Sequence, residues 1–288
     1  MLLMPFHRRH TVCLALLMIA GDSLLAEETG KPPAGQRLFF TGHSFHMFVP
    51  RNFDLVVAAA GIQGHKTVGT QGIGGSRVIQ HWDLPDERNK AKPALAGGDI
   101  DIYTMAAHLE IPDPGINHFV ELGLKHNPHM RFLVQASWFP YDVPGDGRIR
   151  DNRERDNAKI ENLQAAVDNW RKQLEKQVDD LNQQHGKTAV GIIPAGDAVI
   201  QLRALVVDGR YPGITRQSEL FRDPIGHGGG HVHWLVTYCN FAAIYRTPPT
   251  ALADTADGVS AAQHEILKNI AWAKVSAYPY AGVTLVNK

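Results

Sequence analysis

The sequence has no surplus of charge of either sign, because 29 lysine and arginine residues stand against 29 aspartate and glutamate residues. A dedicated nucleic-acid-binding protein is therefore excluded, since such a protein needs an excess of basic residues to neutralise phosphates. Wholesale disorder is excluded as well, because 44% of the residues are hydrophobic and the formal net charge is zero. The 288 residues suffice for a sizeable core in one large domain or two small ones.

Cysteine is scarce too, and two cysteines in 288 residues exclude a disulfide framework. The N-terminal apolar run, Val12 to Ala20, has nine residues, which is too short for a membrane-spanning helix of about 20. Arg8 and Arg9 precede this run, and small and apolar residues follow it up to Ala26. This layout is typical of a secretory signal peptide over residues 1–26. An uncleaved N-terminal anchor is the alternative.

Cleavage after Ala26 would produce a secreted or periplasmic protein with one cysteine, Cys239, and no stable membrane insertion. Residues 27–36 are polar and rich in Gly and Pro, so we expect a flexible leader there. Residues 37–288 are expected to form a single domain. The sequence does not indicate an oligomeric state.

Apolar runs and helical patterns alternate along the rest of the chain. The pattern predicts a buried strand at 37–41 and further strands at 65–70, 100–106, 131–137 and 188–194. The helical patterns cover 49–60, 157–184, 197–207, 231–245 and 261–273. Such an alternation predicts an α/β fold with a parallel sheet that is covered on both faces. The charged stretch 141–156 interrupts it and is expected to be a loop-like insertion or a lid.

Ser44 directly follows the first predicted strand, in Gly42-His43-Ser44-Phe45-His46. Function in open parallel sheets gathers at the carboxyl ends of the strands, so Ser44 is a candidate nucleophile. The N–H groups of the turn can hold a developing oxyanion. A helix-capping serine is the alternative. The flanking His43 and His46 are expected to line the pocket, since residues adjacent to a serine rarely have the geometry to accept its proton.

A glycine-rich loop, residues 69–76, follows the second predicted strand. Its glycines allow the backbone to approach a ligand closely, so one N–H can serve as an oxyanion donor. A phosphate cradle is disfavoured because the lysine of a P-loop is absent. A flexible turn is the remaining alternative.

Asp223 lies four residues before His227 on a turn that contains Pro224 and Gly226. This spacing can place a carboxylate against one imidazole nitrogen and leave the other nitrogen for a serine. His231 and His233 follow closely, which raises a metal-dependent hydrolase as an alternative. No carboxylate-rich segment lies nearby to complete a coordination shell, so neither a metal nor an organic cofactor is predicted.

Taken together, these blocks resemble the SGNH/GDSL hydrolase family. Gly42-His43-Ser44-Phe45 is similar to the first block of the family, Gly74-Gly75-Ser76 to the second, and Asp223 with His227 to the fifth. The resemblance implies a flavodoxin-like three-layer α/β/α sandwich with about five parallel strands in the order 2-1-3-4-5. It also implies ester hydrolysis through an acyl-enzyme.

The resemblance assigns a catalytic triad to Ser44, His227 and Asp223, and an oxyanion hole to the N–H groups of Ser44 and Gly75. The sequence departs from the family at two places. The Asp-to-His spacing is one residue longer than usual, and the asparagine of the third block is missing. His108, which follows the third predicted strand, is a candidate replacement for that asparagine.

The substrate class is inferred from the surroundings of the predicted site. Trp82 and Trp138 lie near the predicted carboxyl ends of strands, where indole rings can stack on a sugar. Export, balanced charge and the lack of a long apolar lid favour an acyl ester of a carbohydrate, either a small molecule or a polysaccharide, over a lipid. A non-catalytic glycan-binding protein on the same scaffold is the alternative from another functional class.

Overall fold

The computed structural model describes residues 31–142, 148–249 and 258–283, and from Pro32 onward the described chain belongs to one compact unit. The predicted signal peptide and the first part of the predicted leader lie outside the described residues. None of the described helices has the length and apolar character that a membrane span requires.

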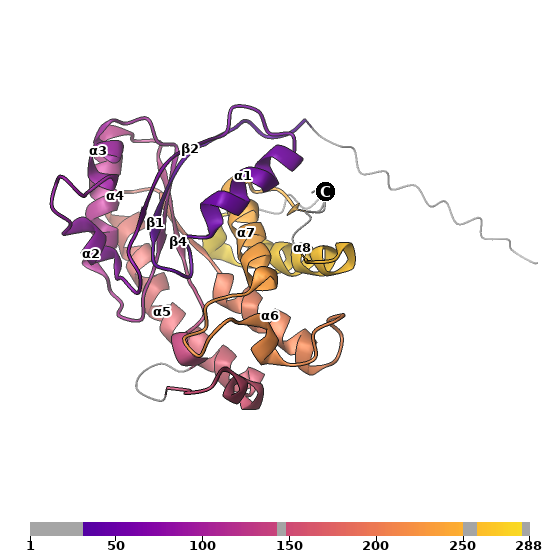
Figure 1. Cartoon of the computed structure of the whole chain (residues 1–288). Coiled ribbons are helices and arrows are strands. Elements are labelled where there is room, and N and C mark those ends of the chain that lie inside the picture. The colour runs from indigo at the N-terminus through magenta and orange to yellow at the C-terminus, as the bar shows by residue number, and fades with distance from the viewer. Residues whose placement is uncertain (1–30, 143–147, 250–257, 284–288) are drawn as a thin grey trace, which may run out of the picture. The chain divides into compact units, whose positions relative to one another are not determined.

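A five-stranded parallel sheet forms the centre of this unit (Figure 1). Its strands are β1 (Arg37–Gly42), β2 (Lys66–Gly72), β3 (Ile102–Ala106), β4 (Arg131–Gln135) and β5 (Val190–Ile193). They lie in the order β2-β1-β3-β4-β5, and every neighbouring pair is parallel. The predicted α/β class and strand order are confirmed.

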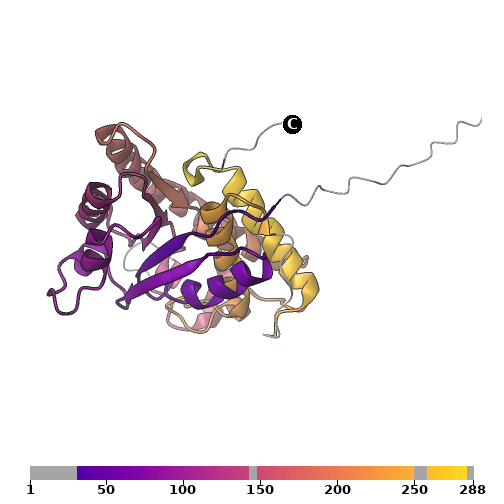
Figure 2. The ribbon, with the colours of Figure 1, turned by 90° about the horizontal axis from the view of Figure 1, so that it is seen from above.

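Helices cover both faces of the sheet, which makes the three-layer sandwich seen from two directions in Figures 1 and 2. One face carries α1 (Val49–Ala59), α6 (Ala195–Val207), α7 (Gly230–Tyr245) and α8 (Ala261–Ser276). The other carries α2 (Val78–Trp82), α3 (Ala91–Ala96), α4 (Pro114–His126) and α5 (Ile160–Gln184). Successive strand side chains alternate between the faces, so Phe40 joins the first core and Phe39 the second. Strands β1, β3, β4 and β5 thus supply consecutive apolar residues to the two cores, whereas the edge strand β2 supplies none.

Helices α2, α3 and α4 were not predicted from the sequence. The apolar residues of α4 have helical spacing, but Gly115 and Gly123 interrupt the pattern. Gly115 is needed because a Cβ atom there would lie 2.3 Å from the backbone nitrogen of Ile79 in α2. The buried carboxylate of Asp113 accepts hydrogen bonds from the N–H groups of Gly115 and Ile79, so one side chain caps both helices.

A buried polar network lies under the carboxyl ends of β3 and β4. The Gln135 side-chain oxygen is 2.8 Å from His46 Nδ1, and Thr104 Oγ1 is 3.0 Å from His46 Nε2. Since an amide oxygen can only accept, Nδ1 donates and Nε2 accepts from the threonine hydroxyl. The amide nitrogen of Gln135 in turn donates to the carbonyl oxygen of Phe45 in the turn after β1.

His46 is therefore not a pocket residue, which corrects the prediction from its position two residues after Ser44. Its side chain is fully buried and points into the network below the turn. Burial lowers the pKa of His46 to about 4, although the hydrogen bond with Gln135 acts in the opposite direction. The imidazole is consequently neutral in the folded protein across the physiological range.

We expect the free energy of unfolding to fall as the pH drops from 6.5 towards 4. Over this range the unfolded chain takes up a proton at His46, whereas the folded protein does so only near pH 4. One such group contributes a slope of up to about 1.4 kcal/mol per pH unit. His46→Gln should flatten the slope in urea unfolding at pH 7, 6 and 5, while the exposed His129→Gln should leave it unchanged. Equal slopes for wild type and His46→Gln would contradict this role.

Candidate active site

Ser44 lies in the tight turn between β1 and α1. The turn is closed by hydrogen bonds from the N–H groups of His46 and Met47 to the carbonyl oxygen of His43, at 3.0 and 3.1 Å. Gly42 permits this geometry because a Cβ atom at its position would lie 2.9 Å from the Cβ of Ala106 in β3. Ser44 is half-buried at the carboxyl end of the sheet, as its position after β1 predicted.

His227 lies between Ser44 and Asp223 and contacts both. Its Nε2 is 2.9 Å from the Oγ of Ser44, and its Nδ1 is 2.6 Å from Oδ2 of Asp223. A carboxylate can only accept, so Nδ1 carries the proton and Nε2 is free to accept from the serine hydroxyl. The three side chains named from the sequence thus form one hydrogen-bonded series.

The longer Asp-to-His spacing is accommodated by a small hairpin. Phe221 and Gly228 form an isolated antiparallel bridge, and between them Gly226 adopts a φ of 102°, which strongly favours glycine. The second carboxylate oxygen of Asp223 accepts from the N–H groups of Gly226 and His227, at 3.0 and 3.2 Å. Burial raises the pKa of Asp223, but the hydrogen bonds from His227 and Gly226 outweigh it and hold this pKa below its ordinary value. Asp223 is therefore an ionised partner for the imidazole.

The loop after β2 brings Gly75 to the same pocket as Ser44. Gly75 has a φ of 63°, a conformation that a side chain would strain. Ser76, whose role the sequence did not reveal, holds the loop: its hydroxyl donates to the carbonyl oxygen of Ile73 at 2.9 Å and accepts from His81 Nε2 at 2.7 Å. Among the described residues, the backbone N–H groups of Ser44 and Gly75 have no protein acceptor.

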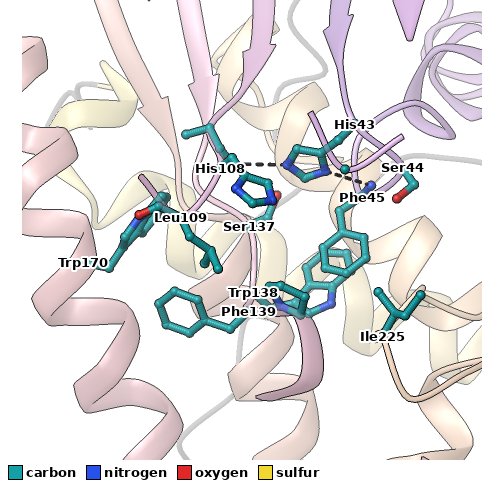
Figure 3. Close-up of a pocket in the computed structure, with 13 residues that line it drawn as sticks. His43, Ser44, Phe45, His108, Leu109, Ser137, Trp138, Phe139, Trp170 and Ile225 are labelled. Atoms are coloured by element: carbon teal, nitrogen blue, oxygen red, sulfur yellow. Dashed lines mark hydrogen bonds between the residues drawn. The ribbon is translucent and has the colours of Figure 1, made fainter. Parts of the chain in front are cut away.

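A pocket opens beside Ser44, and Figure 3 shows the side chains around it. His43 lines it as predicted, but its ring is engaged: Nε2 donates to the carbonyl oxygen of Ala107 at 3.2 Å, and Nδ1 accepts from the N–H of Phe45. Burial lowers the pKa of His43 to about 3. His108 stands beside His43 with the ring centroids 5.8 Å apart, and burial lowers its pKa as well. Both imidazoles are neutral walls of the pocket.

The two tryptophans predicted to bind a sugar have different positions. Trp138 lines the pocket but is buried, stacks on Phe45 at 4.7 Å and donates its indole N–H to the carbonyl oxygen of Gly226. The prediction for Trp82 is wrong, because its ring packs on Phe119 of α4 and does not line the pocket. Trp170 of α5 lines the far side of the pocket.

A buried charge cluster anchors the Asp223–His227 hairpin. Arg203 forms a two-pronged contact with the Asp142 carboxylate, at 2.9 and 2.7 Å, and Arg155 binds the same carboxylate. The other end of the Arg155 guanidinium donates to the carbonyl oxygens of Asp223 and Pro224, at 3.3 and 3.0 Å. Arg155 is fully buried, although it belongs to the charged stretch 141–156, which was expected to be a loop-like insertion or a lid. Residues 143–147 of that stretch lie outside the described residues.

The histidines proposed for the alternative metal site have separate partners. His231 lies 2.8 Å from the Tyr211 hydroxyl, and the His233 ring stacks on Phe48 with a centroid distance of 3.9 Å. In the described part of the chain, no three His, Cys, Asp or Glu side chains are grouped so that they could hold a metal ion. The three histidines therefore do not converge as that alternative requires.

Loss of the Asp142 charge should destabilise the protein strongly. Asp142→Asn would leave two buried guanidinium groups without their counter-ion, which typically costs about 3–5 kcal/mol. The matched control is Asp208→Asn, since Asp208 pairs with Arg210 on the surface and such pairs contribute about 1 kcal/mol or less. Urea unfolding of both variants measures the difference, and an equal loss in both would contradict a dominant role of the cluster.

No family model and no curated protein matches the sequence. Among solved structures, a DUF4886 family protein from Bacteroides uniformis is similar, with a TM-score of 0.59 and 13% identity over 85% of this chain and 96% of that one. A protein from Slackia heliotrinireducens, provisionally described as an SGNH hydrolase, has 16% identity and a TM-score of 0.41 over 72% of this chain and 97% of its own. A TM-score below 0.5 does not establish a shared fold, so the likeness rests on the Bacteroides protein and concerns the fold alone.

Proposed function

We propose that the chain is a serine hydrolase that cleaves a carboxylic ester through an acyl-enzyme. The observation that carries the proposal is the series Asp223–His227–Ser44, with 2.6 Å between carboxylate and imidazole and 2.9 Å between imidazole and hydroxyl. The motifs shared with SGNH/GDSL hydrolases support the same chemistry. A serine with a neutral imidazole in reach, itself oriented by a carboxylate, is an activated nucleophile.

In the first half of the reaction, the Ser44 hydroxyl attacks the ester carbonyl and His227 Nε2 takes its proton. Asp223 holds the imidazole in the required tautomer and stabilises the imidazolium that forms. The oxygen of the tetrahedral intermediate would accept from the N–H groups of Ser44 and Gly75, each worth about 3–4 kcal/mol. His108 is the third candidate donor, because it lines the same pocket.

In the second half, His227 returns the proton to the leaving alcohol, and the acyl group remains on Ser44. Water then attacks the acyl-enzyme, again with His227 as the base, and the acid is released. The predicted export remains part of the proposal. The sugar preference has lost its structural basis, because Trp82 lies away from the pocket and the buried Trp138 ring is stacked on Phe45.

The glycan-binding alternative makes a different prediction about Ser44. A binding protein has no need of a serine within 2.9 Å of an imidazole that a carboxylate orients. A reactive Ser44 therefore distinguishes an enzyme from a binding protein on the same scaffold.

We expect Ser44→Ala to lower kcat/KM for p-nitrophenyl butyrate by at least about 10³-fold, because the nucleophile is lost while the fold stays intact. Ser276→Ala, at the end of α8, is the control and should keep full activity. A fluorophosphonate probe should label wild-type protein at Ser44, identified by peptide mass. Full activity of Ser44→Ala would contradict the assignment. If the wild-type protein is neither labelled by the probe nor able to hydrolyse the ester, the binding-only alternative is favoured.

A further inference from the structure

The pocket beside Ser44 is walled mostly by aromatic and aliphatic side chains, and His43, His108 and Ser137 add polar groups to the lining. Its cavity volume is about 70 Å³, and Ala107, Leu109, Trp138, Phe139, Trp170 and Ile225 line it together with Ser44 and Gly75. A single water needs about 10–15 Å³ of such a volume, so the cavity has room for roughly five to seven groups of that size. The cavity is therefore large enough for a short acyl chain and larger than the methyl group of an acetyl ester needs.

The indole N–H groups and the His43 ring in these walls are occupied already, so His108 and the Ser137 hydroxyl remain as the polar side chains that could meet a ligand. The indole N–H of Trp138 donates to the carbonyl oxygen of Gly226 at 2.9 Å, and that of Trp170 donates to the carbonyl oxygen of Leu109 at 3.0 Å. The ring of His43 uses both nitrogens on backbone groups. A sugar hydroxyl in this cavity would lose its water partners and gain few in return, which is unfavourable. A hydrocarbon chain loses nothing there and gains from leaving water.

The position of the cavity relative to the nucleophile indicates which part of the substrate enters it. Ser44 lies at one end, whereas Leu109 and Trp170 lie on the far side (Figure 3). With the carbonyl carbon at Ser44 and the oxyanion at the Gly75 N–H, the acyl chain would point between Leu109 and Phe139 towards Trp170. The leaving alcohol departs on the side of His227, which is not part of these walls.

We infer that this cavity is an acyl-binding site for unbranched saturated chains of about four to six carbons, so that acetyl is a poor substrate. The inference rests on the proposed ester hydrolysis at Ser44. It assigns specificity to Leu109, Phe139 and Trp170, which lie outside the three blocks that suggested the chemistry.

The test is a series of p-nitrophenyl esters with acyl chains of two, four, six and twelve carbons. Each buried methylene should raise kcat/KM up to about fourfold, the equivalent of about 0.8 kcal/mol, so butyrate should exceed acetate by about tenfold. The dodecanoate should fall well below hexanoate because a cavity of about 70 Å³ is too small for a twelve-carbon chain. A preference for acetate, or equal rates along the series, would overturn the inference.

Leu109→Trp fills the cavity from a half-exposed loop position, where a larger side chain can be accommodated. It should lower the ratio of kcat/KM for hexanoate to kcat/KM for acetate at least tenfold. Leu55→Trp, at an exposed site on α1, is the matched control and should change neither rate. An equal loss for acetate and hexanoate would contradict an acyl site, and the wild-type series decides the question if Leu109→Trp does not fold.

Binding to Ser44→Ala separates this inference from the proposed reaction. Hexanamide should bind this variant at least tenfold more tightly than acetamide does. The dissociation constants can be measured by tryptophan fluorescence, since Trp138 and Trp170 line the cavity. Such a difference without any ester hydrolysis by the wild type would defeat the proposed reaction and leave a chain-binding site. Hydrolysis without any difference between the two amides would defeat the acyl site and leave the reaction.

Discussion

The parallel direction of all five strands is the constraint on which the site depends. It places every carboxyl end at one edge of the sheet, although the segments that follow the strands are far apart in the sequence. Ser44 follows β1, Gly75 follows β2, His108 follows β3 and Trp138 follows β4. The sheet thereby brings together a nucleophile, a backbone donor, an imidazole and an apolar wall. No local sequence pattern contains all four.

The Asp223–His227 hairpin is the one part of the site that the sheet does not position. It reaches Ser44 across 183 residues of chain, so tertiary contacts must hold it. The buried cluster of Asp142, Arg155 and Arg203 supplies them, with Arg155 bonded to the hairpin backbone. Burying two guanidinium groups beside one carboxylate carries a large desolvation free energy. This is offset only where hydrogen bonds also satisfy the remaining N–H groups. Here the backbone carbonyls of the hairpin meet part of that need.

Hydrogen bonds within the protein also determine what the pocket can bind. The two indoles and one imidazole in its walls donate hydrogen bonds to backbone carbonyl oxygens. These bonds fix the orientation of the rings, so mainly carbon atoms are left to contact a ligand. Two tryptophans near strand ends therefore do not by themselves indicate a sugar site. An indole stacks on a sugar through an exposed ring face, and the fold decides which faces are exposed: Phe45 packs on Trp138, and Phe119 packs on Trp82.

The sequence by itself determined the α/β class and the approximate positions of the strands, and it indicated three candidate residues, because apolar runs and the Ser44 and Asp223–His227 blocks are local patterns. The strand order was implied only by the resemblance to SGNH/GDSL hydrolases. It could not separate His43, which lines the pocket, from His46, which points into the core, since a tight turn reverses direction within a few residues. Nor did it reveal that Arg155 is buried, because Arg155 lies in a stretch rich in charged residues. Only the tertiary structure decided which charges are buried, which indole rings line the pocket and how the hairpin docks. Burial and hydrogen bonding depend on neighbours that are remote in the chain.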